Sequence, residues 1–259
     1  MSEVWETMFR TQFEPDDPAM FRAVIDLIND TVNKCGNGRY AIMEYDSAVD
    51  IPAEDLRTMT MLDGLKTQGY ACYNDGIQDA TDIVTIRDTR DNALCAIGDG
   101  RSMPDSVYAE LSGLCTNPQY VQRGMAMLVA SVLVCRFLLA GRYHVICAAA
   151  HDATAVICKR LGMSDESNSM RIHSAQYNTA ELKYQLAASI AANTSACKLN
   201  NDVQPSETLQ QAINEVRGSQ RAGRRRRLRP RRRTSHRRRT THRRRTSHHR
   251  FRRRATRRR

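Results

Sequence analysis

The last 39 residues of this 259-residue chain limit what can fold. Positions 221–259 hold 22 Arg and no Lys, Asp or Glu, and their only large apolar side chains are Leu228 and Phe251. Such a segment cannot bury enough apolar surface to offset the entropy lost when a chain becomes ordered. We therefore expect a disordered basic C-terminal tail, with the fold confined to residues 1–220.

The remaining 220 residues have the opposite charge. They carry 28 Asp and Glu against 18 Lys and Arg, a balance of −10, although the whole chain has a formal charge of +12. Almost all of the apolar residues lie in this stretch, which is long enough for one large domain or two small ones. The sequence therefore predicts an acidic folded body joined to a polycation.

Metal, membrane and secretory functions have little support in the sequence. No two of the eight Cys lie within four residues of each other, so the CxxC spacing of zinc and redox sites is absent. The apolar stretch 125–140 is interrupted by Arg136 and is shorter than the ~20 residues that a bilayer requires. Residues 1–22 lack a continuous apolar run. We expect an intracellular protein with core thiols, no metal and no membrane partner.

Apolar spacing and turn residues indicate a mixture of helices and strands. The pattern predicts helices over 20–32, 52–65, 125–140, 153–160 and 179–192, a short helix after Ser206, and strands over 40–45, 83–86, 93–97, 107–115, 143–150 and 170–176. The run Val145 to Ala150 lacks alternation, which is typical of a strand buried on both faces. The order of the elements predicts an α+β fold containing one strand–helix–strand unit.

The segment from Tyr108 to Leu128 reads as a strand, a short loop, Gly124 and the start of a helix. A helix N-terminus presents unpaired N–H groups, and a glycine there lets a diphosphate approach the backbone closely. This makes the loop a candidate phosphate site. An ordinary strand-to-helix turn gives the same local pattern.

Two blocks around this segment resemble the GNAT superfamily of acetyl-CoA-dependent acyltransferases. The block from Val121 to Ala126 is similar to the family's Q/RxxGxG/A loop for the coenzyme A diphosphate, with Val121 in place of the leading Gln or Arg. The block from His151 to Met163 resembles the NxxAxxLYxxxGF helix, with His151 for Asn, Thr154 for the small residue and Cys158 for Tyr. The resemblance covers about residues 80–177.

The resemblance implies a GNAT-like, mostly antiparallel sheet flanked by helices. It also implies acetyl-CoA as cofactor, and a parting of the strand before the loop from its neighbour. In these terms the chain divides into an N-terminal part of the domain (1–80), a GNAT-like core (81–195), a linker with a short helix (196–220) and the arginine-rich tail (221–259).

The same resemblance implies roles for individual residues. Glu110 takes the position of a general base, and a backbone N–H near Cys115 that of the donor to the thioester carbonyl. The expected cofactor-binding residues are Cys115, Val121, Gln122, Arg123, Gly124, Met125 and Ala126. A surface carboxylate on an amphipathic strand is the simpler interpretation of Glu110. Cys158 stands where the family has a proton-donating Tyr, and packing is its more common role.

The tail contains a six-residue repeat of three Arg, two Ser or Thr and one His, which resembles protamines and basic DNA-packaging proteins of large viruses. The arginines expected to bind nucleic acid are Arg231, Arg232, Arg233, Arg237, Arg238, Arg239, Arg243, Arg244 and Arg245. Twenty-two guanidinium groups match the phosphates of about eleven base pairs, independently of sequence. A nuclear-import signal is the simpler alternative. We expect a location in the nucleus, or in a host nucleus or virion if the chain is viral.

Three functions fit these observations. The leading one is an acetyl-CoA-dependent N-acetyltransferase held on nucleic acid by its tail, with a basic protein as acceptor. The second is a DNA-condensing or virion-packaging nucleoprotein whose GNAT-like domain no longer catalyses, which the departures at Val121, His151 and Cys158 favour. The third is an acetyltransferase for small amines with an incidental tail.

Overall fold

The computed structural model describes residues 2–14, 16–55, 77–103, 105–121, 123–149, 152–167, 171–195 and 199. The chain divides into two units, 1–220 and 221–259, and every described residue belongs to the first. The prediction of a disordered tail, the nine tail arginines and the short helix after Ser206 lie outside the described residues. The same holds for most of the helix predicted over 52–65.

The described residues form helices and strands in a mixed order. The helices are α1 (Ser2–Gln12), α2 (Pro18–Cys35), α4 (Met125–Leu139), α5 (Asp152–Arg160) and α6 (Ala180–Ser195), with short 3-10 turns η1 (Ala48–Asp50), η3 (Ile77–Asp79) and η4 (Pro118–Tyr120). The strands are β1 (Tyr40–Tyr45), β2 (Asp82–Asp88), β3 (Ala93–Ser102), β4 (Tyr108–Thr116), β5 (His144–Ala148), β6 (Ser164–Ser167) and β7 (Ile172–Gln176).

The seven strands form one sheet in the order β1-β2-β3-β4-β5-β7-β6. All neighbouring strands are antiparallel except β4 and β5, which are parallel and are joined through α4. The predicted α+β fold, with a mostly antiparallel sheet flanked by helices, is confirmed. The parallel pair is the one place where a crossover helix is required, because parallel strands cannot be joined by a hairpin.

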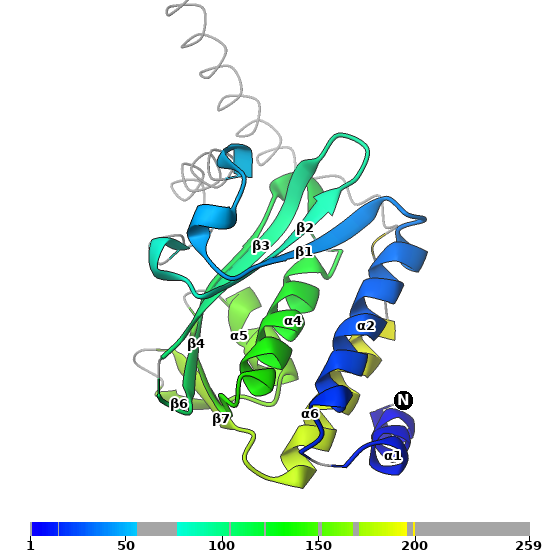
Figure 1. Ribbon diagram of the computed structural model, residues 1–259, viewed down its shortest axis with the longest axis vertical. Coiled ribbons are helices and arrows are strands. Elements are labelled where there is room, and N and C mark those ends of the chain that lie inside the picture. Colours follow the sequence, from blue (N-terminus) through cyan, green and yellow to red (C-terminus); the bar gives the residue numbers. More distant parts are fainter. Residues whose placement is uncertain are drawn as a thin grey trace, which may run out of the picture. The chain divides into compact units, whose positions relative to one another are not determined.

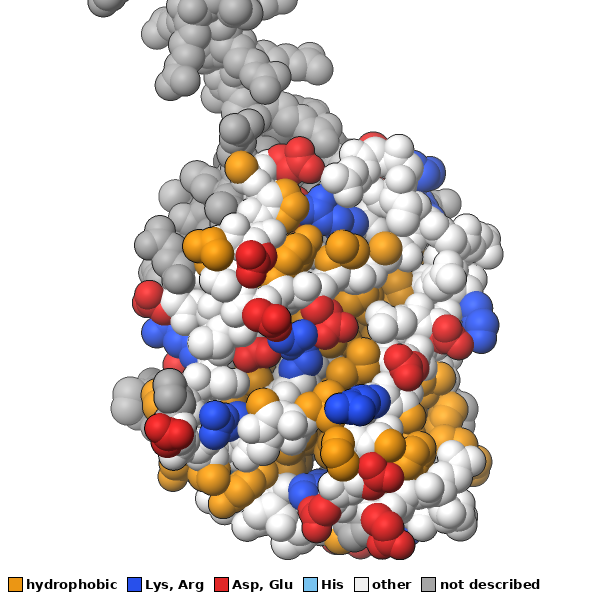
Figure 2. All heavy atoms as spheres, in the orientation of Figure 1, with side chains coloured by type: hydrophobic (Ala, Val, Ile, Leu, Met, Phe, Trp, Pro, Cys, Tyr) orange, Lys and Arg blue, Asp and Glu red, His pale blue; other side chains and the backbone are white. Residues whose placement is uncertain are grey.

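The main core lies between the sheet and the helices (Figure 1). Helix α4 packs on β2, β3 and β4, α2 contacts both α4 and α6, and α1 packs on α6. A second, smaller apolar cluster lies on the opposite face of the sheet and includes Ile83, Ile97 and Cys115. Figure 2 shows acidic and basic side chains interspersed on the face it presents, with apolar side chains between them.

Strand β3 is longer than its sequence predicts, because Gly98 and Gly100 do not end it. An added Cβ at Gly98 would lie 2.5 Å from Val129, and one at Gly100 would lie 2.4 Å from Phe137. The two glycines therefore let α4 lie directly on the sheet. Between them, Asp99 points to the opposite face, since successive strand residues alternate.

Strand β5 differs from the prediction of a strand buried on both faces. Ile146 is half-buried and Ala148 is exposed, whereas Val145 and Cys147 are buried. One face of β5 therefore packs on the helices, while the other lacks a complete cover. This alternation cannot be predicted from the sequence, because the strand is apolar throughout and alanine occurs on buried and exposed faces alike. Helix α1 and strand β6 were not predicted at all.

A substitution at Gly100 tests the close approach of α4. In Gly100→Ala the new methyl group would also lie 2.7 Å from the Glu110 carbonyl oxygen, which cannot move without distorting β4. We expect a loss of about 3 kcal/mol in the free energy of unfolding, measured by urea denaturation. Gly98→Ala meets only side-chain atoms, which can turn aside, and should lose less. A greater loss for Gly98→Ala would contradict this packing.

Candidate functional site

Strands β4 and β5 run side by side for only part of their length. Tyr108 to Leu111 pair with His144 to Cys147, but β4 continues to Thr116 along β3 alone. Beyond Leu111, no strand of the described residues lies beside this edge of β4. The parting of strands that the resemblance implies is present here.

A β-bulge lies where the two strands part. The register of β3 and β4 shifts between Asp99 and Gly100, which leaves Ser112 as the extra residue of β4. Beyond the bulge, the N–H of Asn117 donates to the carbonyl oxygen of Cys95 at 2.8 Å, and these two residues continue the β3–β4 register. Hydrogen-bonded and non-bonded pairs alternate along an antiparallel ladder, so this contact fixes the direction of the N–H groups that precede it.

The alternation assigns the N–H of Cys115 to β3, because Cys115 pairs with Ile97 two positions before the Asn117 contact. The N–H groups of Leu114 and Thr116 then point toward the side that β5 leaves open. The N–H of Cys115 itself is therefore directed into the sheet, and the N–H groups near Cys115 that face the open side are those of its two neighbours. Cys115 is disulfide-bonded, so it also differs from the expected core thiols.

Gly124 begins α4 in a conformation that favours glycine. Its φ is +78°, it caps the helix without a side-chain hydrogen bond, and its carbonyl accepts from Met127 and Leu128. An added Cβ at Gly124 would meet no atom of the described residues within 4 Å. The N–H groups of Met125 and Ala126, the first two of the helix, have no carbonyl partner within the helix. Among the described residues, the start of α4 therefore combines space above Gly124 with two N–H groups that the helix itself does not pair.

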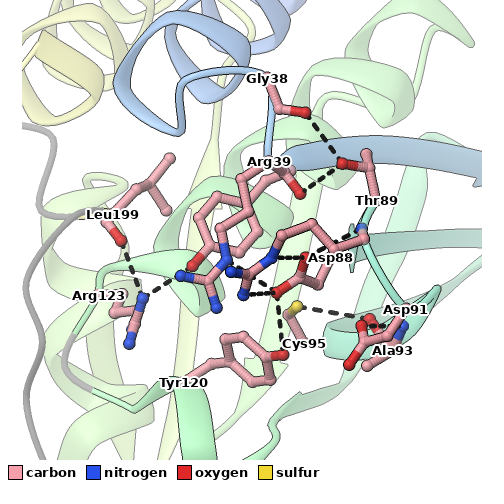
Figure 3. A network of polar contacts seen from close by, with 12 residues as sticks. Gly38, Arg39, Asp88, Thr89, Asp91, Ala93, Cys95, Tyr120, Arg123 and Leu199 are labelled. Atoms are coloured by element: carbon pink, nitrogen blue, oxygen red, sulfur yellow. Dashed lines mark hydrogen bonds and ion pairs between the residues drawn. The ribbon is translucent and has the colours of Figure 1, made fainter.

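The turn that leads into α4 is anchored by side chains that point into the protein (Figure 3). The hydroxyl of Tyr120 donates to Asp88 at 3.3 Å, and Arg123 donates to the hydroxyl of Tyr40 at 2.7 Å and to the carbonyl of Leu199 at 3.1 Å. Arg123 is 7% exposed. Its side chain thus supports the turn from within, and the loop would offer main-chain groups to a ligand.

The other residues predicted for this loop are placed less uniformly. Val121 is half-buried, Met125 is buried in the core and Ala126 is half-buried. Gln122 lies outside the described residues, as does His151. The predicted loop residues are therefore brought together at the start of α4, except for Gln122, whose position is not described.

Asp88 is the centre of the polar network beneath the turn. Its carboxylate is completely buried and accepts hydrogen bonds from Arg39 at 2.8 Å and from Arg90 at 2.9 Å. Burial alone would raise the pKa of Asp88, but the hydrogen bonds from Arg90 and Arg39 outweigh it and hold the pKa well below its usual range. Asp88 therefore remains ionised and links the end of β2 to the turn before α4.

Glu110, the predicted base, lies on the sheet face opposite α4. It is half-buried and stands opposite Arg101 on β3. Its diagonal neighbour on β3, Asp99, was not identified from the sequence. Asp99 lies between two glycines, and Asp-Gly usually indicates a turn. Only the packing of α4 on these glycines shows that Asp99 is inside a strand.

Cys158 occupies the position of the family's Tyr and is completely buried on α5. Its thiol is hydrogen-bonded to that of Cys147, and this contact, together with burial, raises the pKa of Cys147. A thiol in this setting packs in the core. His144 stacks on Tyr108, with ring centroids 4.4 Å apart.

Within the described ranges, no group of three or more His, Cys, Asp or Glu could hold a metal ion. Among the helices of the described part, we find none with the length and apolar character that crossing a bilayer requires.

No protein-family model and no curated protein matches the chain. Solved structures do. A structure described as an N-acetyltransferase from Lactobacillus plantarum aligns with 54% of the residues of this chain and with 99% of its own residues. The aligned residues are 12% identical and the TM-score is 0.43. A GNAT-family acetyltransferase assigned in Desulfovibrio desulfuricans aligns over 53% and 99%, with 13% identity and a TM-score of 0.40.

N-acetylglutamate synthase from Neisseria gonorrhoeae, solved with coenzyme A and N-acetyl-glutamate, aligns over 53% of this chain and 35% of its own. Its identity is 10% and its TM-score is 0.40. At these values the likeness concerns the arrangement of helices and strands, and each neighbour's activity is its own.

The pH dependence of stability tests the role of Asp88. Because its folded pKa is lowered, its carboxylate stabilises the fold above pH ~4, and this contribution is lost as the pH falls below that value. Asp88→Asn should lower the free energy of unfolding at pH 7 by roughly 2 kcal/mol, less than for a fully buried pair, since Arg90 is 63% exposed. Denaturation with urea from pH 7 to pH 2 measures it.

The difference between wild type and Asp88→Asn should shrink as the pH falls from 5 toward 2. Asp30→Asn is the matched control, because Asp30 forms an exposed ion pair with Lys34 and should contribute within about 0.5 kcal/mol. An equal loss at pH 7 and pH 2 would show that the carboxylate charge of Asp88 does not hold the turn.

Proposed function

We propose that this protein is an acetyl-CoA-dependent N-acetyltransferase, tethered to nucleic acid by its arginine-rich tail. One observation carries the proposal: β4 parts from β5 directly before a turn that ends in open space at Gly124. A parted strand offers N–H groups along its free edge, and the start of a helix offers N–H groups to an anion. These two sets of donors are suited to the two polar ends of a long, phosphorylated thioester.

The residues present fit coenzyme A. The N–H groups at the start of α4 would hold the diphosphate, and the absence of a Cβ at Gly124 leaves room for it to approach. The N–H groups of Leu114 and Thr116 would donate to the thioester carbonyl and stabilise the negative charge that develops on its oxygen. Acetyl-CoA supplies the acetyl group in an activated form.

Glu110 is the proposed base. An amine acceptor is protonated at neutral pH and must lose a proton before its nitrogen can attack. Glu110 is half-buried on β4, one residue before the last residue that pairs with β5. A carboxylate there is close to the parting strands and still open to solvent, which suits it to take a proton from an incoming ammonium group.

A basic protein is the proposed acceptor. The folded body has an excess of ten negative charges, which would attract a lysine-rich segment over a distance of about a Debye length. The tail has no lysine, so it is not a substrate for lysine acetylation by its own domain. Tethering to nucleic acid would raise the local concentration of basic proteins bound to the same polymer.

The tail is proposed to bind nucleic acid without regard to sequence. Its repeat provides charge and no rigid element that could read base edges. The protein would then reside where nucleic acid is concentrated, in a nucleus or a virion.

A second function is favoured by a specific observation. Cys158 is a buried free thiol hydrogen-bonded to the free thiol of Cys147, so the helix that would supply a tyrosine proton donor in the family supplies only a core thiol at this position. The absence of this proton donor would not matter to a packaging nucleoprotein whose domain is inactive. A transferase could work without it only if the departing thiolate needs no proton donor.

Coenzyme A binding distinguishes these functions and has a matched control. Gly124 and Gly141 have nearly the same φ, +78° and +75°, and an added Cβ meets nothing at either. Each Gly→Ala change should therefore cost about 1 kcal/mol of stability from backbone strain. Only Gly124→Ala should weaken acetyl-CoA binding, by at least tenfold, in titration calorimetry.

If wild type does not bind acetyl-CoA, the transferase proposal is wrong and the nucleoprotein remains. Equal affinities in wild type and Gly124→Ala would show that the cofactor binds elsewhere.

The tail proposal predicts steep salt dependence. Fluorescence titration of duplex DNA should give a similar affinity for unrelated sequences. Replacing the nine repeat arginines with Gln should reduce the slope of log K against log salt by roughly eight, whereas replacing them with Lys should retain most of it. A Gln variant that keeps the wild-type slope would exclude the repeat as the binding element.

A further inference from the structure

Three buried side-chain oxygens on neighbouring strands lack hydrogen-bond partners among the described residues. They are Thr85 Oγ1 on β2, Asp99 Oδ1 on β3 and Ser112 Oγ on β4. Thr85 and Asp99 are 0% and 2% exposed. Buried polar groups in native proteins are nearly always hydrogen-bonded, so three such atoms on adjacent strands need an explanation.

The three residues lie on the same face of the sheet. Asp99 is on the face opposite α4, since α4 occupies the space above Gly98 and Gly100 on either side of it. In the β2–β3 register Asp99 faces Ile83, and Thr85 is two residues farther along β2 on the same face. In the β3–β4 register Asp99 faces Gly113, directly after the bulged Ser112.

Glu110 belongs to the same face. It pairs with Arg101, which is two residues from Asp99, so Asp99 and Glu110 are diagonal neighbours across β3 and β4. Diagonal neighbours have Cα atoms about 7–8 Å apart, within the reach of long side chains. Ser112 lies between them on β4. Glu110, Ser112 and Asp99 thus form a row of polar residues on this face, in which Glu110 is half-buried and Asp99 is buried.

The surroundings of Asp99 favour its neutral form. The pKa of Asp99 is raised from 3.8 to about 6, chiefly by burial; the charge of Arg101 opposes this rise and the charge of Glu110 adds to it. Arg101 forms an ion pair with the exposed Asp79 at 3.2 Å, so its charge is partly directed away from Asp99. On β2 the residues facing Asp99 are uncharged. Among the described groups, Arg101 and Glu110 are thus the charged neighbours that act on it.

We propose that Asp99 is the proton-holding partner of Glu110 in acetyl transfer, an inference that rests on the proposed function. In the step, the acceptor ammonium loses a proton to the Glu110 carboxylate and becomes a neutral amine. The proton then passes from Glu110 to the Asp99 carboxylate, which restores the Glu110 carboxylate. The amine nitrogen attacks the thioester, the C–S bond breaks, and the thiolate leaves with the second nitrogen proton.

This arrangement explains why an ionisable group is kept where it is costly. A buried carboxylate without a partner destabilises the fold when ionised, and an amide or alanine there would avoid that cost. Asp99 acts through Glu110, so it is a positioning and relay residue.

The first test does not depend on activity. Because the folded pKa of Asp99 is raised, its contribution to stability is present below pH ~4 and is lost as the pH rises through 6. Asp99→Asn should therefore unfold at higher denaturant than wild type at pH 8, and at a similar concentration at pH 4. The shift of about two pKa units corresponds to a factor of about 100 in the unfolding constant. A less stable Asp99→Asn at pH 8 would overturn the assignment.

The second test uses the release of free coenzyme A thiol with a lysine-rich histone peptide as acceptor. Asp99→Asn should lower kcat/KM at pH 7 at least tenfold and remove the limb of the pH profile near pH 6. Glu110→Gln should cost at least as much. The double variant should lose no more than Glu110→Gln alone, because the two residues act in series.

Asp26→Asn, an exposed aspartate on α2, is the control and should retain wild-type activity. If wild type is active and Asp99→Asn matches it, or if the two losses multiply in the double variant, the relay is wrong while the transferase stands. If wild type neither binds acetyl-CoA nor releases thiol, the transferase proposal fails, and the relay with it. The pH 8 stability of Asp99→Asn then still reports whether Asp99 is ionised without a partner.

Discussion

The structure depends on how one strand satisfies its backbone hydrogen bonds. β4 is paired on both sides up to Leu111 and on one side beyond it. Because every N–H group needs a partner, an open strand edge inside a fold is a place where a ligand can bind. The bulge at Ser112 occurs at that point, and beyond it the N–H groups of alternate residues point toward the opening.

The two faces of the sheet then serve different purposes. On one face, Gly98 and Gly100 have no side chain, so α4 can lie against β3. This packing brings the start of the helix beside the open edge of β4. On the other face, the residue between these glycines is Asp99, whose buried Oδ1 has no hydrogen-bond partner in the described part of the chain. The same three-residue segment therefore positions the helix and supplies a buried carboxylate.

Much of the fold could be predicted from the sequence, and the failures have physical reasons. The βαβ unit was recognisable because Gly124 follows a strand and precedes a long apolar helix. Strand β6, with the sequence Ser164 to Ser167, has no apolar alternation and is ordered by its pairing with β7. Gly98 to Gly100 has the sequence of a turn, and only contact with α4 makes it a strand.

The candidate site could be predicted in part for a similar reason. The position of Gly124 follows from local sequence, because a left-handed cap before a helix favours glycine. The inward direction of Arg123 depends on Tyr40, which is 83 residues away, and no local pattern contains it. The direction of each N–H group on β4 depends on the bulge, which moves every residue after it by one position.

Amide chemical shifts of the ¹⁵N-labelled protein during titration with acetyl-CoA test the central claim most directly. The account predicts that the amides of Leu114, Thr116, Met125 and Ala126 shift strongly, while the amide of Cys115, directed toward β3, shifts much less. Saturable binding that leaves Leu114 and Thr116 unchanged, or that shifts Cys115 most, would contradict the claim that the open edge of β4 receives the thioester.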